Sequence, residues 1–320
     1  MKLHEAHSVP HFDGTASRAH RDAALWRLSL DALPATLQHA GSFAAADAFV
    51  QFVGFPRSGH SLVGSILDAH PQAVIAHELD VMGLVAKNVP LALISGMIAR
   101  NASAFTATGR WWNGFSYTVP EGSHAIPARP AVIGDKKGDW AVRRCDRDPS
   151  LLERARRVLG DRDRWVLVVR HPADNIATMS LRLGKAYDKL RIESARSGFD
   201  RELRAAQHDG RVPDSIADAM IDDYENLCAS IERMQRQLPR ERWHSVVYED
   251  FAARPRDEIA ALYGFAGLEA HESLVSSAAG IVRVGKSRSR DRIGWSAAQE
   301  NRVREIIDRF AFLAPYRTAG

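Results

Sequence analysis

With 320 residues, 45% of them hydrophobic, the chain is long enough to bury one large core and leaves little for a second domain. Its formal net charge of +4 is mild, which favours an anionic small ligand and argues against nucleic acid as a partner. The sequence shows neither an apolar leader nor an apolar run of about 18 residues, so we expect a soluble, cytoplasmic protein without a membrane span.

The chain begins with a polar, histidine-rich stretch that has no periodicity. We expect residues 1–21 to form a flexible tail and residues 22–320 to form a single domain. That domain opens with an amphipathic helix, predicted over residues 23–39.

The next feature is a strand, loop and helix that suit phosphate binding. An apolar run predicts a buried strand over residues 49–53, and a helix is expected over residues 61–67. The loop between them has the spacing Gly54-x4-Gly59, close to the nucleotide-triphosphatase pattern G-x4-G-K-[ST]. His60 stands where that pattern has lysine, and a cation occurs earlier, at Arg57. We therefore predict a phosphate loop that does not bind the β- and γ-phosphates of ATP.

Further apolar runs alternate with helical segments along the rest of the chain. They predict strands over residues 73–76, 131–134, 164–169 and 244–248. Helical periodicity predicts a long helix over residues 213–237, and Ser296 with Gln299 forms a capping box that opens the last helix. Apolar strands between helices are typical of a sheet that is covered on both faces. We expect an α/β protein with a P-loop-type three-layer fold, in which helices flank a central, mostly parallel sheet.

Two segments look irregular. Residues 101–131 are rich in aromatic side chains, glycine and proline, and residues 182–211 are rich in charges of both signs. Such loops either line a substrate pocket or cover the core, and the sequence leaves both possibilities open.

A second cluster of charged and polar residues follows the strand at residues 164–169. Arg170 lies at its carboxyl end, the edge of an open α/β sheet where ligands bind. Thr178 and Arg182 lie four residues apart on the next helix and therefore share a face with each other. The three side chains could converge on one anion, whereas Arg170 taken alone could instead pair with Asp174.

Together, these motifs resemble the sulfotransferases that use 3′-phosphoadenosine 5′-phosphosulfate (PAPS). The first signature of that family matches Pro-Arg-Ser-Gly-His at residues 56–60, and its second, an arginine followed eight residues later by a serine, matches Arg170 and Thr178. Arg182 and the stretch 67–71 resemble the tyrosylprotein branch of the family. The segment Tyr-Glu-Asp at residues 248–250 resembles a later family segment whose tyrosine approaches the cofactor.

The resemblance implies PAPS as the cofactor and 3′,5′-adenosine bisphosphate as the product. It assigns the 5′-phosphosulfate to the phosphate loop, through Arg57, Ser58, Gly59, His60 and Ser61. It assigns the remaining cofactor contacts, including those to the 3′-phosphate, to Arg170, Thr178, Arg182, Tyr248, Lys286 and Ser287. His60 replaces the usual threonine, so a hydroxyl contact to the 5′-phosphate is either replaced by an imidazole contact or lost.

The resemblance also implies a set of catalytic residues. Glu78, just after the strand at 73–76, corresponds to the catalytic glutamate of the tyrosylprotein branch, and His77 is the alternative base. Asp80 is a further carboxylate for which a capping or surface role is expected. Arg57 and Lys136 are expected near the transferring group, with Lys137 as a second lysine.

We expect no metal site. Arginine and lysine supply the positive charge that Mg²⁺ provides in kinases, and the sequence has no tight cluster of metal ligands. Cys145 and Cys228 lie far apart without a CxxC pattern, which predicts buried free thiols.

The sequence therefore predicts an enzyme that transfers a sulfuryl group from PAPS to a hydroxyl or amine. Two alternatives remain open: a P-loop kinase of small molecules, and a non-catalytic nucleotide-binding or scaffold protein on the same fold. The two irregular segments are compatible with a sugar, a phenol, a peptide tyrosine or a natural product as the acceptor.

Overall fold

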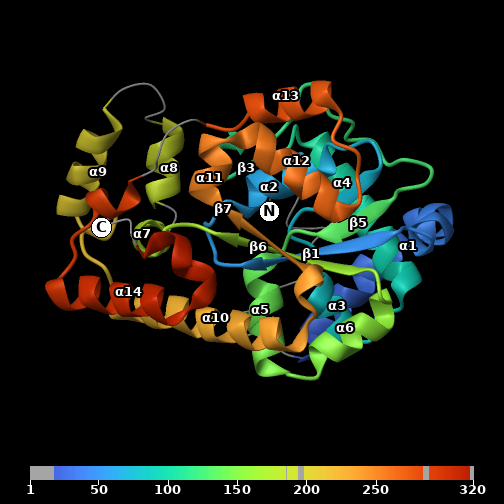
Figure 1. The fold of residues 1–320 in the computed structure, drawn as a ribbon, viewed down its shortest axis with the longest axis horizontal. Coiled ribbons are helices and arrows are strands. Elements are labelled where there is room, and N and C mark those ends of the chain that lie inside the picture. Colours follow the sequence, from blue (N-terminus) through green and yellow to red (C-terminus); the bar gives the residue numbers. More distant parts are fainter. Residues whose placement is uncertain (1–17, 185, 194–197, 284–287, 318–320) are drawn as a thin grey trace.

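A computed structural model describes residues 18–184, 186–193, 198–283 and 288–317. Its central sheet has the strand order β2-β5-β1-β6-β7, and every neighbouring pair is parallel (Figure 1). The bounds of these strands are β1 (Ala48–Gly54), β2 (Ala73–Ala76), β5 (Val132–Asp135), β6 (Asp163–Val169) and β7 (Trp243–Val247). Two short antiparallel strands, β3 (Trp111–Trp112) and β4 (Phe115–Ser116), form a separate hairpin.

Helices cover both faces of the sheet and connect its strands. They are α1 (Arg18–Ala44), α2 (His60–Asp68), α3 (Val81–Ala86), α4 (Leu91–Ala107), α5 (Gly138–Arg147), α6 (Leu151–Leu159), α7 (Pro172–Leu181), α8 (Ala186–Glu193), α9 (Phe199–His208), α10 (Asp218–Gln237), α11 (Tyr248–Ala253), α12 (Pro255–Ala266), α13 (Glu272–Gly280) and α14 (Ala297–Arg309). Short 3-10 turns occur at η2 (Arg240–Arg242), η3 (Ser289–Arg292) and η4 (Ala311–Tyr316).

The central strand β1 shows how the two layers of helices are attached. Phe49 and Val53 face one core, which includes side chains of α3, α5 and α10. Val50 and Phe52 face the other core, which includes side chains of α2, α12 and α13. Because successive side chains of a strand point to opposite faces, an unbroken apolar strand needs helices on both sides.

The predicted fold class is confirmed: the protein is α/β, with a parallel sheet between two layers of helices (Figure 1). All five predicted strands exist, with ends that differ by one residue or less. The capping box of Ser296 and Gln299 is present at the start of α14. Cys145 and Cys228 are free and buried, as predicted.

Two predictions about secondary structure are wrong in part. The helix expected over residues 213–237 begins only at Asp218, because the preceding residues pair with a distant segment through Ile216 N and the carbonyl of Gly294 (3.0 Å). The segments expected to be irregular contain α8, α9 and the end of α4. Tertiary packing stabilises α8 and α9, which are too short to be stable as isolated helices.

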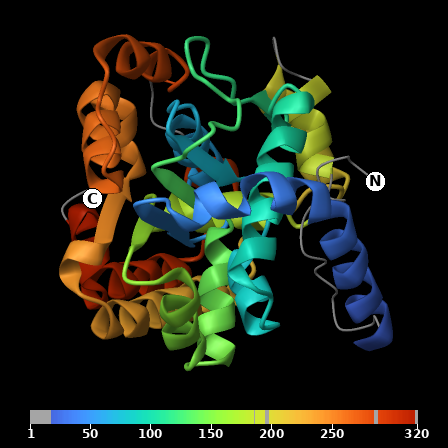
Figure 2. The ribbon, with the colours of Figure 1, turned by 90° about the vertical axis from the view of Figure 1, so that its right-hand side faces the viewer.

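Helix α1 packs along α4 and contributes Leu28, Ala32 and Phe43 to the core that contains Phe49 and Val53 of β1. In Figure 2 its blue ribbon runs down the right-hand side of the molecule. Within the described part of the chain, no helix is long and apolar enough to cross a membrane.

Close packing of β5 against β1 gives a test of the sheet. A Cβ at Gly134 would lie 2.2 Å from the carbonyl oxygen of Val50, so Gly134→Ala must push two central strands apart. We expect a loss of unfolding free energy of about 3 kcal/mol, measured by urea denaturation. Gly264→Ala is the matched control, because that helical glycine has open space around it and alanine should stabilise it by about 0.5–1 kcal/mol. Equal stability of the Gly134→Ala protein and the unsubstituted protein would contradict the packing described.

Candidate active site

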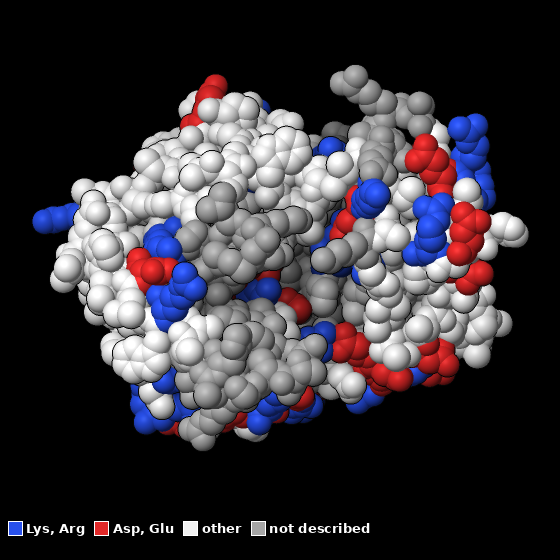
Figure 3. Space-filling view, turned by 180° about the vertical axis from the view of Figure 1, so that it is seen from behind, with Lys and Arg blue, Asp and Glu red and all other residues white. Residues whose placement is uncertain are grey.

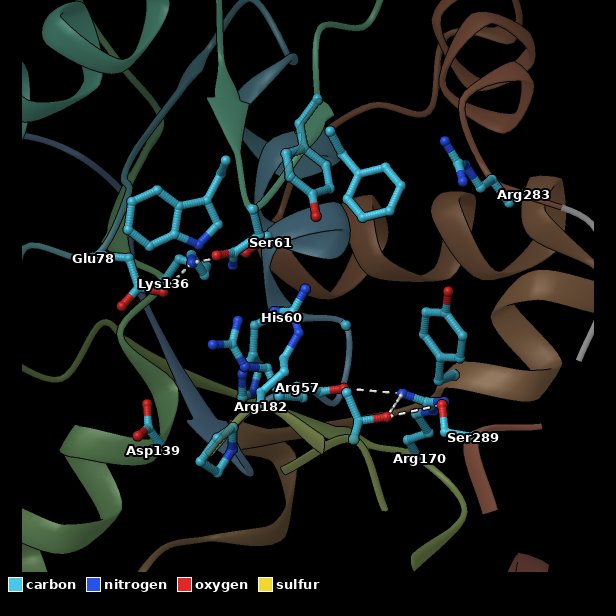
Figure 4. Close-up of a pocket in the computed structure, with 18 of the residues that line it drawn as sticks. Arg57, His60, Ser61, Glu78, Lys136, Asp139, Arg170, Arg182, Arg283 and Ser289 are labelled. Atoms are coloured by element: carbon cyan, nitrogen blue, oxygen red, sulfur yellow. Dashed lines mark hydrogen bonds and ion pairs between the residues drawn. The ribbon is translucent and has the colours of Figure 1, made fainter. Parts of the chain in front are cut away.

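A pocket of about 660 Å³ lies at the carboxyl edge of the sheet (Figure 4). Each of the five parallel strands is followed, within two residues, either by a residue that lines the pocket or by a loop that leads to the pocket. The strands β2, β5, β6 and β7 lead to Glu78, Lys136, Arg170 and Tyr248, and β1 leads into the phosphate loop. Ligands of open α/β sheets bind along this edge.

The pocket carries an excess of positive charge. Its described lining has two carboxylates, Glu78 and Asp139, against seven basic side chains: Arg57, Lys136, Lys137, Arg170, Arg182, Arg283 and Arg292. On the face shown in Figure 3, basic and acidic side chains outside the central hollow lie in mixed groups. The pocket is therefore suited to a ligand with several negative charges.

The phosphate loop depends on left-handed backbone conformations. Gly54, Arg57 and Gly59 have φ angles of 137°, 68° and 110°. Gly59 is the N-cap of α2 and supplies no side-chain cap, so the first N–H groups of that helix remain for an anion. Glycine is also required here because a Cβ would lie 2.5 Å from the ring of Tyr248.

His60 is turned away from the role that lysine has in a triphosphatase loop. Its Nε2 lies 3.0 Å from the carbonyl oxygen of Val53, which can only accept, so Nε2 carries the proton. Burial lowers the pKa of His60 to about 4, and the ring is neutral at pH 7. A neutral ring with this tautomer brings neither charge nor a second donor, which favours loss of the side-chain contact to phosphate over its replacement by imidazole.

Glu78 lies between two lysines. One of its carboxylate oxygens is paired with Lys136 Nζ and the other with Lys137 Nζ. Lys136 also donates to Ser61 Oγ (3.0 Å) in the first turn of α2, so a single ammonium group touches both the carboxylate and the phosphate loop. Gly64 leaves room for this lysine, because a Cβ there would lie 2.5 Å from Lys136 Cγ.

These pairs determine the ionisation of Glu78. Burial alone raises the pKa of this carboxyl, but the charges of Lys136 and Lys137 outweigh burial and hold it well below its usual range. Glu78 is therefore a carboxylate at neutral pH, with both oxygens engaged.

The structure separates Glu78 from the other candidates for the base. The ring of His77 is stacked on Phe105, with 3.8 Å between ring centroids, and is not part of the described pocket lining. Asp80 caps α3 by accepting from Gly83 N (3.0 Å) and is bound by Arg144, which fits the expected capping role.

Arg170 forms the second half of the site with two hydroxyl groups. Its Nη1 donates to Thr178 Oγ1 (3.2 Å), and its Nη2 donates to Ser289 Oγ (3.3 Å). The two hydroxyl oxygens lie 3.0 Å apart. Arg170 Nη1 also donates to the carbonyl of Arg57 (3.3 Å), which connects this cluster to the phosphate loop (Figure 4).

Ser289 was not predicted from the sequence. The two predicted residues of that segment, Lys286 and Ser287, lie outside the described residues. Ser289 is held in place by its neighbour Arg290, whose Nε and Nη2 both donate to Oδ2 of the buried Asp174 and whose backbone N–H donates to Oδ1 of the same carboxylate. Asp174 thus binds Arg290. It does not form the pair with Arg170 that the sequence left open as an alternative.

The remaining predicted residues are placed as follows. Arg182 lines the pocket and forms an ion pair with Asp188 of α8 (2.6 Å). The Tyr248 ring lies against Gly59 and under the Arg170 guanidinium group. The distance from Arg170 Cζ to the centroid of the ring is 5.9 Å. Ser58 is fully buried and donates to the carbonyl of Phe55 (3.0 Å), so it supports the loop and is absent from the described lining.

Aromatic side chains from the two segments expected to be irregular complete the pocket: Trp112, Phe115, Tyr117 and Tyr187. Their presence favours the first of the two roles left open for these segments, that of lining a substrate pocket. Within the described residues, no group of three or more histidine, cysteine or acidic side chains is arranged to hold a metal ion.

Comparison with known proteins gives a family. A model of the sulfotransferase family matches residues 50–272, more than half of the chain. Solved structures similar to this one include sulfotransferase STF9 from Mycobacterium avium (15% identity over 96% of this chain and 88% of that chain, TM-score 0.47). They also include the sulfotransferase domain from the curacin biosynthetic pathway (14%, 82% and 96%, TM-score 0.45) and mouse sulfotransferase SULT7A1 complexed with PAP (13%, 89% and 95%, TM-score 0.40). No curated protein sequence matches the chain.

The two lysines at Glu78 lead to a prediction about its ionisation. Lys137→Met removes one of the charges that stabilise the carboxylate, so the pKa of Glu78 should rise toward its ordinary value. The measurement is a ¹³C NMR titration of the glutamate carboxyl groups, with the Glu78 signal identified by its loss in Glu78→Gln. Lys87→Met removes an equal charge at an exposed position and should leave the Glu78 titration unchanged. An identical pKa in Lys137→Met and Lys87→Met would contradict the ion pair.

Proposed function

The chain belongs to the sulfotransferase family, and we propose that it transfers a sulfuryl group from PAPS to a hydroxyl or amine of an acceptor. One observation supports the choice of donor: Arg170, bonded to the hydroxyl groups of Thr178 and Ser289, lies beside the phosphate loop and is joined to it, which suits this cluster to hold a second anion. A donor with phosphate groups at both the 3′ and the 5′ position needs two anion sites, whereas the phosphate groups of ATP form one chain and need one continuous site.

The pocket supports this donor in size and in charge. A volume of about 660 Å³ lies within the usual range of ligand pockets, about 300–1,000 Å³. The first turn of α2 would hold the 5′-phosphosulfate, and Arg170 would hold the 3′-phosphate. His60, being neutral, leaves the loop without the lysine charge that β- and γ-phosphates require in a kinase.

The transfer itself is an in-line displacement at sulfur. An oxygen lone pair of the acceptor forms the new bond to sulfur, and the bond from sulfur to the 5′-phosphate oxygen breaks. Its electron pair stays on that phosphate oxygen, and the acceptor proton passes to Glu78. Arg57 and Lys136 supply positive charge where the leaving oxygen becomes negative.

Glu78 cannot accept a proton readily while both of its oxygens are bound to ammonium groups. Lys136 is the partner that can be drawn away, because its Nζ already contacts Ser61 at the start of α2. We therefore expect the donor to bind before the acceptor, with Lys136 moving toward the donor as Glu78 becomes available.

The acceptor would lie against the aromatic lining. Trp112, Phe115, Tyr117 and Tyr187 offer flat apolar faces, which suit a phenol, a sugar ring or another ring-bearing acceptor.

The first functional prediction concerns the base. Glu78→Gln keeps the size of the side chain but removes its capacity to take a proton, so turnover of PAPS with phenol as a minimal acceptor, which keeps its proton at neutral pH, should fall at least about 100-fold. Binding of 3′,5′-adenosine bisphosphate, measured by calorimetry, should remain within about threefold. Undiminished turnover in Glu78→Gln would remove Glu78 from its proposed role.

The second functional prediction concerns the 3′-phosphate. Arg170→Ala removes charge-assisted hydrogen bonds of about 1.5–3 kcal/mol, so the Kd for 3′,5′-adenosine bisphosphate should rise about 10- to 100-fold. The Kd for 5′-AMP should change less than about threefold, since that ligand lacks the 3′-phosphate. An equal loss for the two nucleotides would show that Arg170 supports the loop generally and does not read the 3′-phosphate.

A further inference from the structure

The hairpin β3–β4 has a turn whose geometry its sequence explains. Asn113 and Gly114 both have left-handed backbones, with φ angles of 51° and 83°, as in a type I′ turn. Asparagine and glycine are the residues that adopt this conformation most easily. The turn brings the tip of the hairpin into the pocket lining, beside Arg57.

The tip of the hairpin is bonded to the phosphate loop. With its amide oriented so that the oxygen faces the two donors, Asn113 Oδ1 accepts from Trp112 Nε1 (2.7 Å) and from Arg57 Nη1 (2.9 Å). The Trp112 ring also lies near the ammonium group of Lys136, 5.9 Å from Nζ to the ring centroid. The hairpin therefore contacts both of the cations assigned to the leaving oxygen.

The base of the hairpin is fixed by a buried ion pair. Arg110, only 2% exposed, contacts Asp68 Oδ2 (2.8 Å) and donates to Ser65 Oγ (3.2 Å), both on α2. A pair buried this deeply holds its geometry, because breaking it leaves an uncompensated charge. The hairpin is thus attached to α2 at one end and to the loop that precedes α2 at the other.

We propose that Asn113 is a positioning residue: its side-chain oxygen fixes the guanidinium group of Arg57 for sulfuryl transfer, and it couples the acceptor-facing hairpin to the donor loop. This inference rests on the proposed function. Trp112, Phe115 and Tyr117 of the same segment line the pocket. An acceptor that contacts these side chains therefore contacts the hairpin that holds Arg57.

The chemistry of an amide suits this role. Arg57 sits on a left-handed backbone at the tip of a loop, and its long side chain has many rotamers. A carboxylate would hold the guanidinium firmly but would also neutralise it. The neutral oxygen of Asn113 takes one N–H, so the charge and the other N–H groups of Arg57 remain for the phosphate oxygen on which the electron pair collects.

Asn113→Gly removes the amide, and with it the bonds to Arg57 and to Trp112, while glycine keeps the left-handed turn. We expect kcat for PAPS and p-nitrophenol to fall about 10- to 100-fold, while the Kd for 3′,5′-adenosine bisphosphate changes less than about threefold. Trp111→Ala alters the neighbouring residue, which is 60% exposed, and should leave kcat within about twofold.

A double-mutant cycle separates positioning from a general structural role. If Asn113 acts through Arg57, then Asn113→Gly should cause little further loss in the Arg57→Ala background. Full additivity of the two losses would overturn the inference even though sulfuryl transfer itself is intact.

A measurement without any acceptor tests the same contact. ¹H–¹⁵N NMR spectra of the whole protein report how fast the Arg57 guanidinium group rotates. This rotation should be slow in the unsubstituted protein and in Trp111→Ala, and fast in Asn113→Gly. Unaltered Arg57 signals in Asn113→Gly would overturn the inference. Absence of PAPS turnover in the unsubstituted protein, with the Arg57 signals responding as expected, would count against the proposed function and leave the contact standing.

Discussion

Strands β1 and β6 are neighbours in the sheet, so the loops at their carboxyl ends occupy adjoining space. The hydrogen bond from Arg170 to the carbonyl of Arg57 spans that space and joins the two halves of the pocket that we propose to bind anions. It also stabilises a left-handed arginine, a conformation that costs about 1–2 kcal/mol for residues other than glycine. The distance between the halves is therefore set by strand pairing, and a ligand with two separated phosphate groups would find both proposed sites already formed.

The same arrangement concentrates positive charge in a partly closed space. Seven basic side chains face two carboxylates in the described lining, and Glu78 compensates for two lysines at once. Before an anion arrives, this pairing lowers the cost of burying Lys136, whose pKa burial depresses. In the proposed reaction, a bound phosphosulfate would take over that role and release the carboxylate. Charge balance of this kind would make the proposed base available only when the donor is present.

The site residues whose positions depend on local sequence pattern could be predicted. Those whose positions depend on contacts between distant segments could not. Glu78, Lys136 and Arg170 could be placed because each follows an apolar run whose end is visible in the sequence, whereas Tyr248 was placed only by the resemblance to the family. Ser289 could not, because the contact that positions it joins Arg290 to Asp174, 116 residues away. The alternation of serine with basic residues in that segment gives no register from which to choose between Ser287 and Ser289. The Asn113-Gly114 pair, however, is a recognised hairpin signal and could have identified the element that contacts Arg57.

The central claim is that the donor is a 3′-phosphorylated adenosine nucleotide. Calorimetry on the unsubstituted protein with 3′,5′-adenosine bisphosphate, 5′-AMP and ATP–Mg²⁺ tests it most directly, because it needs no knowledge of the acceptor. The account predicts tight binding of the bisphosphate and binding of the other two that is weaker by about 100-fold or more. Preferential binding of ATP–Mg²⁺, or equal binding of the bisphosphate and 5′-AMP, would contradict it.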